Sequence, residues 1–268
     1  MSFSIAGKTA VVTGAANGVG LAIARHFVEK GARVMFADMD EERLQAELGS
    51  GTEEEDSVAW FAGDLRQKLT LANLLSATLD RFDRIDILVN GSRKLLVGDP
   101  LDSDEDGFEA TLQQNLLPTL RVTQTFARRM IRQAEEDDDD APAGSIINLS
   151  SIAARRTQPG LMAFSVTSAA IDQLTRSMAV SLAPHRIRVN GIALGSVMTT
   201  GLQSSLKSQD DLRGRILAAT PLNRIAGASE VAEVAHFLAS EASGFMTGRV
   251  LTVDGGRTLV DAADAPAH

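Results

Sequence analysis

Short runs of apolar and β-branched residues recur along the chain, each separated from the next by a segment of helix length. Continuous apolar runs of this kind are typical of parallel strands that are buried on both faces of a sheet. The strands that we predict on this basis are 9–13, 33–37, 57–61, 86–90, 145–149, 187–194 and 249–253.

The segments between these runs show helical periodicity. One clear apolar stripe is formed by Leu71, Leu74, Leu75, Thr78 and Leu79. Regular alternation of strands and helices predicts an α/β fold, with a doubly wound parallel sheet and right-handed crossovers. Because no linker-like segment interrupts the alternation, we predict a single domain over residues 1–268, with about seven parallel strands flanked by helices.

Three segments depart from this pattern. The acidic run at 135–140 lacks the alternating ligands and central glycine of a calcium loop, so we interpret it as a solvated loop after a long helix. The segment 196–225 is polar and weakly periodic, which favours a mobile lobe that covers a substrate. We expect residues 259–268 to form a flexible tail.

Composition excludes several classes of function. The net charge of −9 opposes binding to nucleic acid or to an anionic membrane surface. The chain has no run of apolar residues long enough to span a bilayer. Its N-terminal residues lack the basic region followed by an apolar region that is typical of a secretion signal. We therefore expect a cytoplasmic protein. Its content of 44% hydrophobic residues is enough for a full hydrophobic core.

Metal and thiol chemistry also find little support in the sequence. The absence of cysteine excludes disulfides, thiolate catalysis and cysteine-bound zinc. The four histidines never lie at the i, i+4 spacing of two metal ligands on one helix. We therefore predict no metal site for His26, His185, His236 and His268.

A glycine-rich segment follows the first predicted strand and opens a helix. Gly14 permits a tight turn, Gly18 lets a pyrophosphate approach the backbone, and Gly20 lets the helix pack close to the strand. The helix N-terminus adds N–H donors and the positive end of a dipole. We predict that a dinucleotide is held here by Gly14, Asn17, Gly18, Val19 and Gly20.

Asp38 stands at the end of the second predicted strand. A carboxylate there accepts hydrogen bonds from the adenosine ribose and repels a 2′-phosphate, so it predicts a preference for NAD over NADP. The glycine turn offers no basic partner for that phosphate, and Asn17 occupies the expected position. The alternative is that Asp38 is a solvated residue at the start of an acidic helix.

The spacing Gly-x-x-x-Gly-x-Gly resembles the short-chain dehydrogenase/reductase family, and further motifs follow in the family's order. The resemblance covers residues 5 to 258 and implies an NAD(P)-binding Rossmann domain with oxidoreductase activity. Residues 188–195 resemble the sixth-strand motif and 253–256 the closing motif. The site residues that the resemblance implies are the adenine-contacting pair Asp64 and Leu65, the strand-end Asn90, the helix-bending Asn115 and the catalytic Ser151.

Two central positions of the family's active site are replaced. The family has a tyrosine at the position of Phe164 and a lysine at the position of Ser168. In the family the tyrosine exchanges the proton, and the lysine lowers the pKa of that tyrosine and holds the nicotinamide ribose. The chain has no tyrosine at all. Ser151 either still polarises a carbonyl or only satisfies nearby backbone groups.

Other positions near the nicotinamide half also differ. The family's Asn-Asn-Ala-Gly motif is Asn90-Gly91-Ser92-Arg93 here, its Pro-Gly is Leu194-Gly195, and a glycine is replaced by Ala154 before Arg155-Arg156. We expect Arg93 to point to solvent, as long side chains readily do. The alternative is that Arg93, beside Lys94, enters the site and partly replaces the lost lysine.

Three functions remain open at this stage. The first is an NAD(H)-binding pseudoenzyme that serves as a sensor or regulatory subunit. The second is an active oxidoreductase with a site rebuilt around Ser151 and Arg93, and the third is a structural partner without a cofactor. For each, the family resemblance implies a homodimer or homotetramer formed through the helices that carry Asn115 and Phe164. The substrate is left open.

Overall fold

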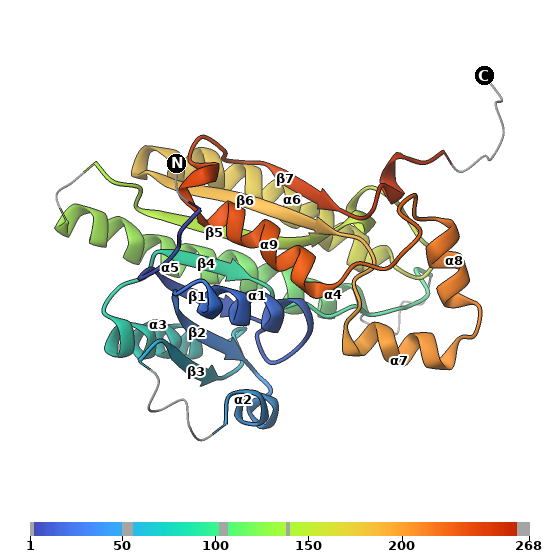
Figure 1. Ribbon diagram of the computed structural model, residues 1–268, viewed down its shortest axis with the longest axis horizontal. Coiled ribbons are helices and arrows are strands. Elements are labelled where there is room, and N and C mark those ends of the chain that lie inside the picture. Colours follow the sequence, from blue (N-terminus) through green and yellow to red (C-terminus); the bar gives the residue numbers. More distant parts are fainter. Residues whose placement is uncertain (1–2, 50–55, 102–106, 138–139, 262–268) are drawn as a thin grey trace.

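A computed structural model describes residues 3–49, 56–101, 107–137 and 140–261. Seven parallel strands form one sheet in the order β3-β2-β1-β4-β5-β6-β7 (Figure 1). The predicted doubly wound α/β fold is therefore confirmed. The strands are β1 (Thr9–Thr13), β2 (Arg33–Asp38), β3 (Val58–Ala62), β4 (Ile87–Asn90), β5 (Gly144–Ser151), β6 (Ile187–Leu194) and β7 (Val250–Val253).

Strand bounds follow the predicted apolar runs closely. The largest difference is at β5, which continues beyond its apolar run to Ser151. Its last residues keep the register with β6, where Ser151 pairs with Leu194. This extra length brings Ser151 to the end of the sheet at which a ligand would bind.

Helices cover both faces of the sheet. One face is packed by α1 (Gly18–Glu29), α2 (Glu41–Leu48) and α9 (Ala228–Ala239). The other face is packed by α3 (Lys68–Phe82), α5 (Leu117–Glu136) and α6 (Met162–Leu182). The buried Leu71, Leu74 and Thr78 of α3 come from the predicted apolar stripe.

The sheet order reverses at β1, whose two neighbours are β2 and β4. In open α/β sheets, a crevice forms beyond the carboxyl ends of the strands at such a switch point. Thr13 pairs with Ala37 on one side and with Asn90 on the other, so the segments that follow these three strands lie together. These segments carry the glycine turn, Asp38 and Arg93.

The structure describes the 196–225 segment in full and the acidic run and the C-terminal tail in part. Residues 196–225 contain α7 (Thr200–Ser208) and α8 (Leu212–Ala218), which lie together at one end of the molecule (Figure 1). α5 ends at Glu136 and β5 begins at Gly144, as predicted for the acidic run, of which 138–139 lie outside the described residues. Of the predicted tail, 262–268 lie outside them too.

The remaining helical elements are short. They include α4 (Gly107–Thr111), the π-helix η1 (Leu112–Leu116) and the 3-10 turns η2 (Ile152–Ala154), η3 (Ala183–His185), η4 (Glu241–Ser243) and η5 (Arg257–Leu259). None of the helices in the described ranges combines the length and the hydropathy that crossing a bilayer requires.

Candidate functional site

A cleft of about 690 Å³ opens beyond the carboxyl ends of β1, β2 and β4. It brings together residues that are distant in the sequence, and the 196–225 segment lines it through Thr199 and, in α7, through Gly201 and Leu202. The predicted site residues in its lining are Gly14, Asn17, Gly18, Val19, Gly20, Asp38 and Phe164.

The glycine turn forms one side of the cleft and requires glycine at two positions. Gly14 has φ +70°, and a Cβ there would lie 2.7 Å from the backbone nitrogen of Ser92. A Cβ on Gly20 would lie 2.1 Å from the carbonyl oxygen of Gly14. Helix α1 therefore starts in direct contact with the turn. Within the described chain the side chain of Asn17 makes no capping bond to the first turn of α1, which leaves those N–H groups open to an anion.

The carboxylate of Asp38 is fixed at the edge of the cleft by three backbone N–H groups. Its Oδ2 accepts a hydrogen bond from Ala16 N at 3.1 Å, which joins it to the glycine turn. Its Oδ1 accepts from Met39 N at 2.7 Å and from Asp40 N at 3.1 Å. The side chain is therefore held in place at the cleft and not free in solvent.

Asp64 and Leu65 line a small hollow that shares Asp38 with the main cleft. The Asp64 carboxylate accepts hydrogen bonds from Arg66, with Nη2 to Oδ2 at 2.7 Å. This hydrogen bonding lowers the pKa of Asp64, so the group is ionised at neutral pH. Leu65 is buried beside it.

Asn90 lies below the cleft and not in its lining. Its Nδ2 donates to Thr123 Oγ1 at 2.9 Å and to Asn148 Oδ1 at 2.8 Å. Asn148 in turn donates to Thr175 Oγ1 on α6 at 2.9 Å. This buried network joins β4 and β5 to α5 and α6, so the Asn90 side chain positions the strand ends.

Asn115 lies in the π-helix between α4 and α5, where the family resemblance implies a bent helix. Its Oδ1 accepts from Lys94 N at 2.8 Å, and its Nδ2 donates to Lys94 O at 2.9 Å. Pro118 follows at the start of α5 and has no N–H for the usual i→i−4 bond, which favours the local change of pitch. Asn115 thus holds the segment that follows β4 against this helix.

Phe164 and Ser168 lie one turn apart on α6, and both are buried. Phe164 lines the cleft, and its ring has no proton to donate. The Ser168 hydroxyl donates to the carbonyl oxygen of Phe164 at 2.7 Å. Its proton is therefore used within its own helix, a common arrangement for serine inside a helix.

Ser151 ends β5 and caps the short turn η2. Its Oγ accepts a hydrogen bond from Ala153 N at 3.2 Å. This bond satisfies a nearby backbone group, and it uses the oxygen as an acceptor while the hydroxyl proton stays available. Ser151 could therefore polarise a substrate carbonyl or serve only to satisfy the backbone, because this geometry is compatible with both roles.

The expectation that Arg93 points to solvent is wrong. Its guanidinium turns into the cleft lining, and Nη1 donates to the carbonyl oxygen of Ser150 at 2.8 Å. Burial lowers the pKa of Arg93 to about 10, so the side chain is still a cation at neutral pH. Among the described residues no carboxylate pairs with it. The main-chain carbonyl of Ser150, near the end of β5, holds the side chain inward, and no sequence pattern indicates that acceptor.

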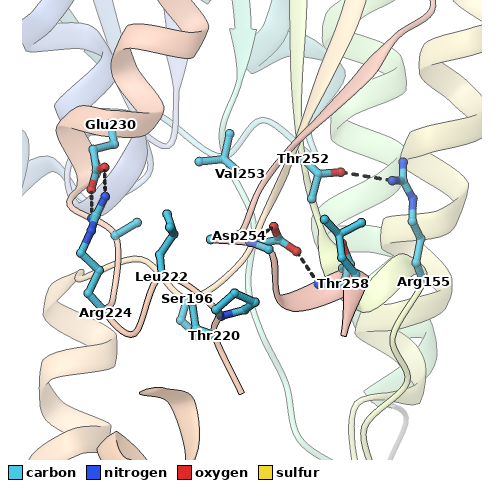
Figure 2. Close-up of a pocket in the computed structure, with 15 residues that line it drawn as sticks. Arg155, Ser196, Thr220, Leu222, Arg224, Glu230, Thr252, Val253, Asp254 and Thr258 are labelled. Carbon is cyan, nitrogen blue, oxygen red and sulfur yellow. Dashed lines mark hydrogen bonds and ion pairs between the residues drawn. The ribbon is translucent and has the colours of Figure 1, made fainter. Parts of the chain in front are cut away.

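A second pocket, of about 680 Å³, was not predicted from the sequence. It lies at the ends of β6 and β7 and is bordered by the segment after α8 (Figure 2). Its charged groups already have partners: Asp254 accepts from Thr258 N at 2.7 Å, and Arg224 pairs with Glu230 at 2.6 Å. Arg155 donates to Thr252 Oγ1 at 3.2 Å. Because these charged groups already pair with one another, the cleft, whose Arg93 has no carboxylate partner among the described residues, is the better candidate site.

Two of the scattered histidines meet in the folded chain, which their spacing in the sequence did not indicate, while the prediction of no metal site stays a prediction. His26 of α1 and His236 of α9 have ring centroids 5.3 Å apart, and Glu233 lies between them. The sequence criterion considered spacing along one helix only, whereas this group forms across two packed helices.

A family model described as enoyl-(acyl carrier protein) reductase matches residues 14–258. The chain belongs to the short-chain dehydrogenase/reductase family. Among its relatives, the L-fucose dehydrogenase of Mus musculus is 36% identical over 260 residues, covering 94% of this chain and 89% of that protein. The 3-oxoacyl-(acyl-carrier-protein) reductase FabG of Chlamydia pneumoniae is 34% identical over 258 residues, covering 96% of this chain and 100% of that protein.

Solved structures match the fold over nearly the whole chain. A gluconate 5-dehydrogenase from Burkholderia cenocepacia, in complex with NADP and tartrate, has a TM-score of 0.86 at 28% identity. The match covers 97% of this chain and 98% of that one. A 7α-hydroxysteroid dehydrogenase complexed with NADH and 7-oxo glycochenodeoxycholic acid has a TM-score of 0.86 at 27% identity, covering 95% of each chain.

Proposed function

We propose that the protein binds NAD(H) in preference to NADP(H) and that its carbonyl or alcohol chemistry is weak or lost. The observation that carries this proposal is the contrast between the two halves of the cleft. One half contains the glycine turn and Asp38, whereas the other is lined by Phe164, and Ser168 is buried one helical turn further along α6; these two side chains supply neither a mobile proton nor a charge.

The adenosine half of the cleft fits a dinucleotide. The turn closes so tightly around Gly14 and Gly20 that the uncapped N–H groups of α1 face the space where a pyrophosphate would lie. Asp38 lies beside that space with its carboxylate already oriented by backbone donors. Ribose hydroxyls would donate to its remaining lone pairs, and a 2′-phosphate would be repelled.

The nicotinamide half lacks the groups that exchange a proton with a carbonyl. A bound nicotinamide ring would supply or accept the hydride. Phe164 keeps an aromatic wall beside it, and Ser168 directs its hydroxyl to the backbone of α6. General acid–base catalysis contributes on the order of 10² to 10⁴ in rate, so its loss leaves at most slow transfer that depends on water.

A second candidate function is an active oxidoreductase with a rebuilt site, and the inward position of Arg93 favours it. The guanidinium lies in the cleft lining without a carboxylate partner in the described part of the chain. It would stabilise developing negative charge on a substrate oxygen, with Ser151 as a hydrogen-bond donor. In that case Arg93→Ala and Ser151→Ala each abolish turnover, and unchanged rates exclude these roles.

The double variant Phe164→Tyr with Ser168→Lys tests the main proposal. We expect the native chain to bind NADH and to show at most trace reduction of a panel of ketones and aldehydes. The double variant should gain at least about 100-fold in rate, because it regains both the proton donor and its cationic partner. Phe164→Tyr alone is the matched control and should gain less. Rapid turnover by the native chain would refute the proposed loss of activity.

A further inference from the structure

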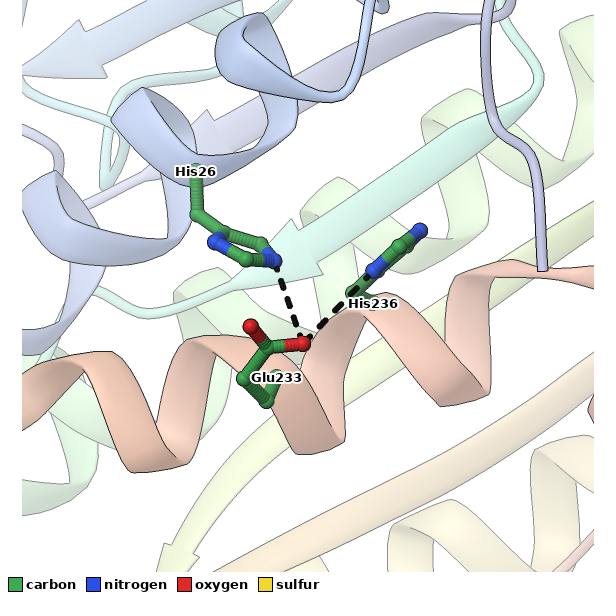
Figure 3. A group of neighbouring side chains, drawn as sticks. All are labelled: His26, Glu233 and His236. Atoms are coloured by element: carbon green, nitrogen blue, oxygen red, sulfur yellow. Dashed lines mark ion pairs between the residues drawn. The ribbon is translucent and has the colours of Figure 1, made fainter.

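A second cluster of chemically active side chains lies between α1 and α9. His26 comes from α1, and Glu233 and His236 come from α9; Figure 3 shows the carboxylate directed to both rings. We propose that these three side chains bind one divalent transition-metal ion of the zinc type. The three ligand atoms all lie within 4.8 Å of one another.

The cluster is separate from the nucleotide cleft. Gly18, at the start of α1, lines the cleft, whereas His26 does not. Eight residues of helix place the two about 12 Å apart along the axis of α1. An ion held here would therefore act on the packing of α1 against α9 and not on a substrate in the cleft.

The hydrogen bond of His236 fixes which of its nitrogens is free. Its Nε2 lies 2.7 Å from the carbonyl oxygen of Phe3. A carbonyl oxygen only accepts, so Nε2 carries the proton and Nδ1 of the neutral ring presents its lone pair to Glu233 Oε2, 3.9 Å away. Histidine ligands of metals are commonly oriented in this way, by a backbone carbonyl bound to the second ring nitrogen.

His26 supplies a buried nitrogen that the protein itself does not satisfy. Within the described residues its Nε2 has no hydrogen-bond partner, and its side chain is only 10% exposed. The nearest acceptor, Glu233 Oε2, lies 3.6 Å away, too far for a hydrogen bond. A buried polar atom without a partner costs about 1–3 kcal/mol, so a ligand that engages it is favoured.

Two of the three separations are close to those around a small bound ion. Ligand atoms of a tetrahedral zinc site, with bonds of 2.0–2.2 Å, lie about 3.4 Å apart, and Glu233 Oε2 lies 3.6 Å from His26 Nε2 and 3.9 Å from His236 Nδ1. The two ring nitrogens lie within 4.8 Å of each other, so the side chains would move together slightly on binding.

The donor set and its exposure indicate the class of ion. Two imidazoles and one carboxylate suit zinc, nickel, copper or cobalt, whereas magnesium and calcium prefer oxygen ligands throughout. The Glu233 side chain is 63% exposed, so an ion reaches the site from solvent and a fourth position is left for water. The same ion would connect α1, α9 and, through His236, the backbone at Phe3.

The experiment is a calorimetric titration of the full chain, without a histidine tag and freed of metal by a chelator, with Zn²⁺ at pH 7. We expect one ion per chain. Glu233→Gln should weaken binding at least tenfold, and His236→Gln should do the same. His185→Gln, which changes an exposed histidine outside the cluster, is the matched control and should leave the affinity unchanged. Binding only at millimolar Zn²⁺, or equal affinities for all variants, would overturn the proposal.

A second readout does not depend on the heat of binding. An ion that binds only the folded state at 100 times its Kd stabilises that state by about 2.7 kcal/mol, which raises the melting temperature by about 5 °C. The native chain should show this rise with Zn²⁺ and none with Mg²⁺. Glu233→Gln, an exposed side chain whose change leaves the core intact, should lose it. A rise that persists in this variant would place the ion elsewhere.

Discussion

Two of the charged side chains that line the cleft, of opposite sign, are held in place by backbone groups. Asp38 holds its carboxylate on backbone N–H groups at one edge, and Arg93 holds its guanidinium on the carbonyl oxygen of Ser150. Both are oriented before any ligand binds, which lowers the cost of ordering them. The rest of the described lining combines the glycine turn, apolar groups such as Phe164 and polar groups such as Gln114.

Replacing Asp38 by alanine should weaken NADH binding by about 10- to 100-fold, because charge-assisted hydrogen bonds contribute about 1.5–3 kcal/mol. NADPH affinity should fall less, because the repulsion of its 2′-phosphate is removed together with the carboxylate. Competitive calorimetry measures both affinities. Asp80→Ala on α3 is the matched control. Equal losses of NADH and NADPH affinity would show that Asp38 only stabilises the glycine turn and does not select between the two nucleotides.

Side-chain direction is the part of the site that the sequence did not predict. The spacing of motifs was enough to place Asp38 and Phe164 at one cleft, because strand ends and helix starts fix their positions. Arg93 was wrongly expected in solvent, because its acceptor comes from β5. The meeting of His26 with His236 depends on how α1 packs on α9, which residue spacing does not encode.

At the scale of elements, the strands and the helices between them could be predicted from their apolar periodicity, since burial on a parallel sheet imposes it. The short helices α7 and α8 were not predicted, because their exposed faces leave little apolar pattern. Where this segment meets α9, Arg224 pairs with Glu230, and Glu230 Oε2 also accepts from Gly227 N at 2.9 Å. The pair joins the segment that borders the cleft to the start of α9.

The hydrogen bond from Arg224 lowers the pKa of Glu230 from 4.5 to about 2. Because the folded-state pKa is the lower one, the contribution of this pair to stability is complete above about pH 4.5 and is lost as the pH falls toward 2. Both side chains are about half exposed, so solvent screening keeps this contribution small. Melting curves of the native chain and Glu230→Gln should differ at pH 7 and converge near pH 2.5.

The matched control for this pH dependence is Glu241→Gln. Glu241 is exposed, and no ion pair to it is found in the described ranges. Its melting temperature should follow that of the native chain at every pH. A difference between the native chain and Glu230→Gln that stays constant down to pH 2.5 would contradict the assigned pKa.

At the scale of the whole molecule, the outer side of α6 bears exposed apolar residues. Val166 is 44% exposed and Val180 is 77% exposed, while the opposite side of the helix packs on the sheet. Single exposed apolar residues are common on protein surfaces, whereas contiguous apolar patches mark protein–protein contacts. These two residues are compatible with the expectation, implied by the family resemblance, that the chain forms a homodimer or homotetramer through α5 and α6.

Light scattering should therefore give a mass that is two or four times the 28.4 kDa of one chain. Val180→Glu should shift the population toward the monomer, because it introduces a charge into the contact. Leu69→Glu, at a residue of α3 that is 72% exposed, is the control and should leave the mass unchanged. A monomeric native chain would refute the expected assembly.

The central claim is our proposal that the cleft holds NAD(H), with Phe164 and Ser168 at the positions where the family resemblance implies a tyrosine and a lysine. Calorimetric titration of the native chain with NADH, and in parallel with NADPH, tests it most directly. We expect micromolar binding of NADH and at least tenfold weaker binding of NADPH. If neither nucleotide binds, the glycine turn is retained only as architecture, the claim is contradicted, and the protein's ligand is to be sought among protein partners.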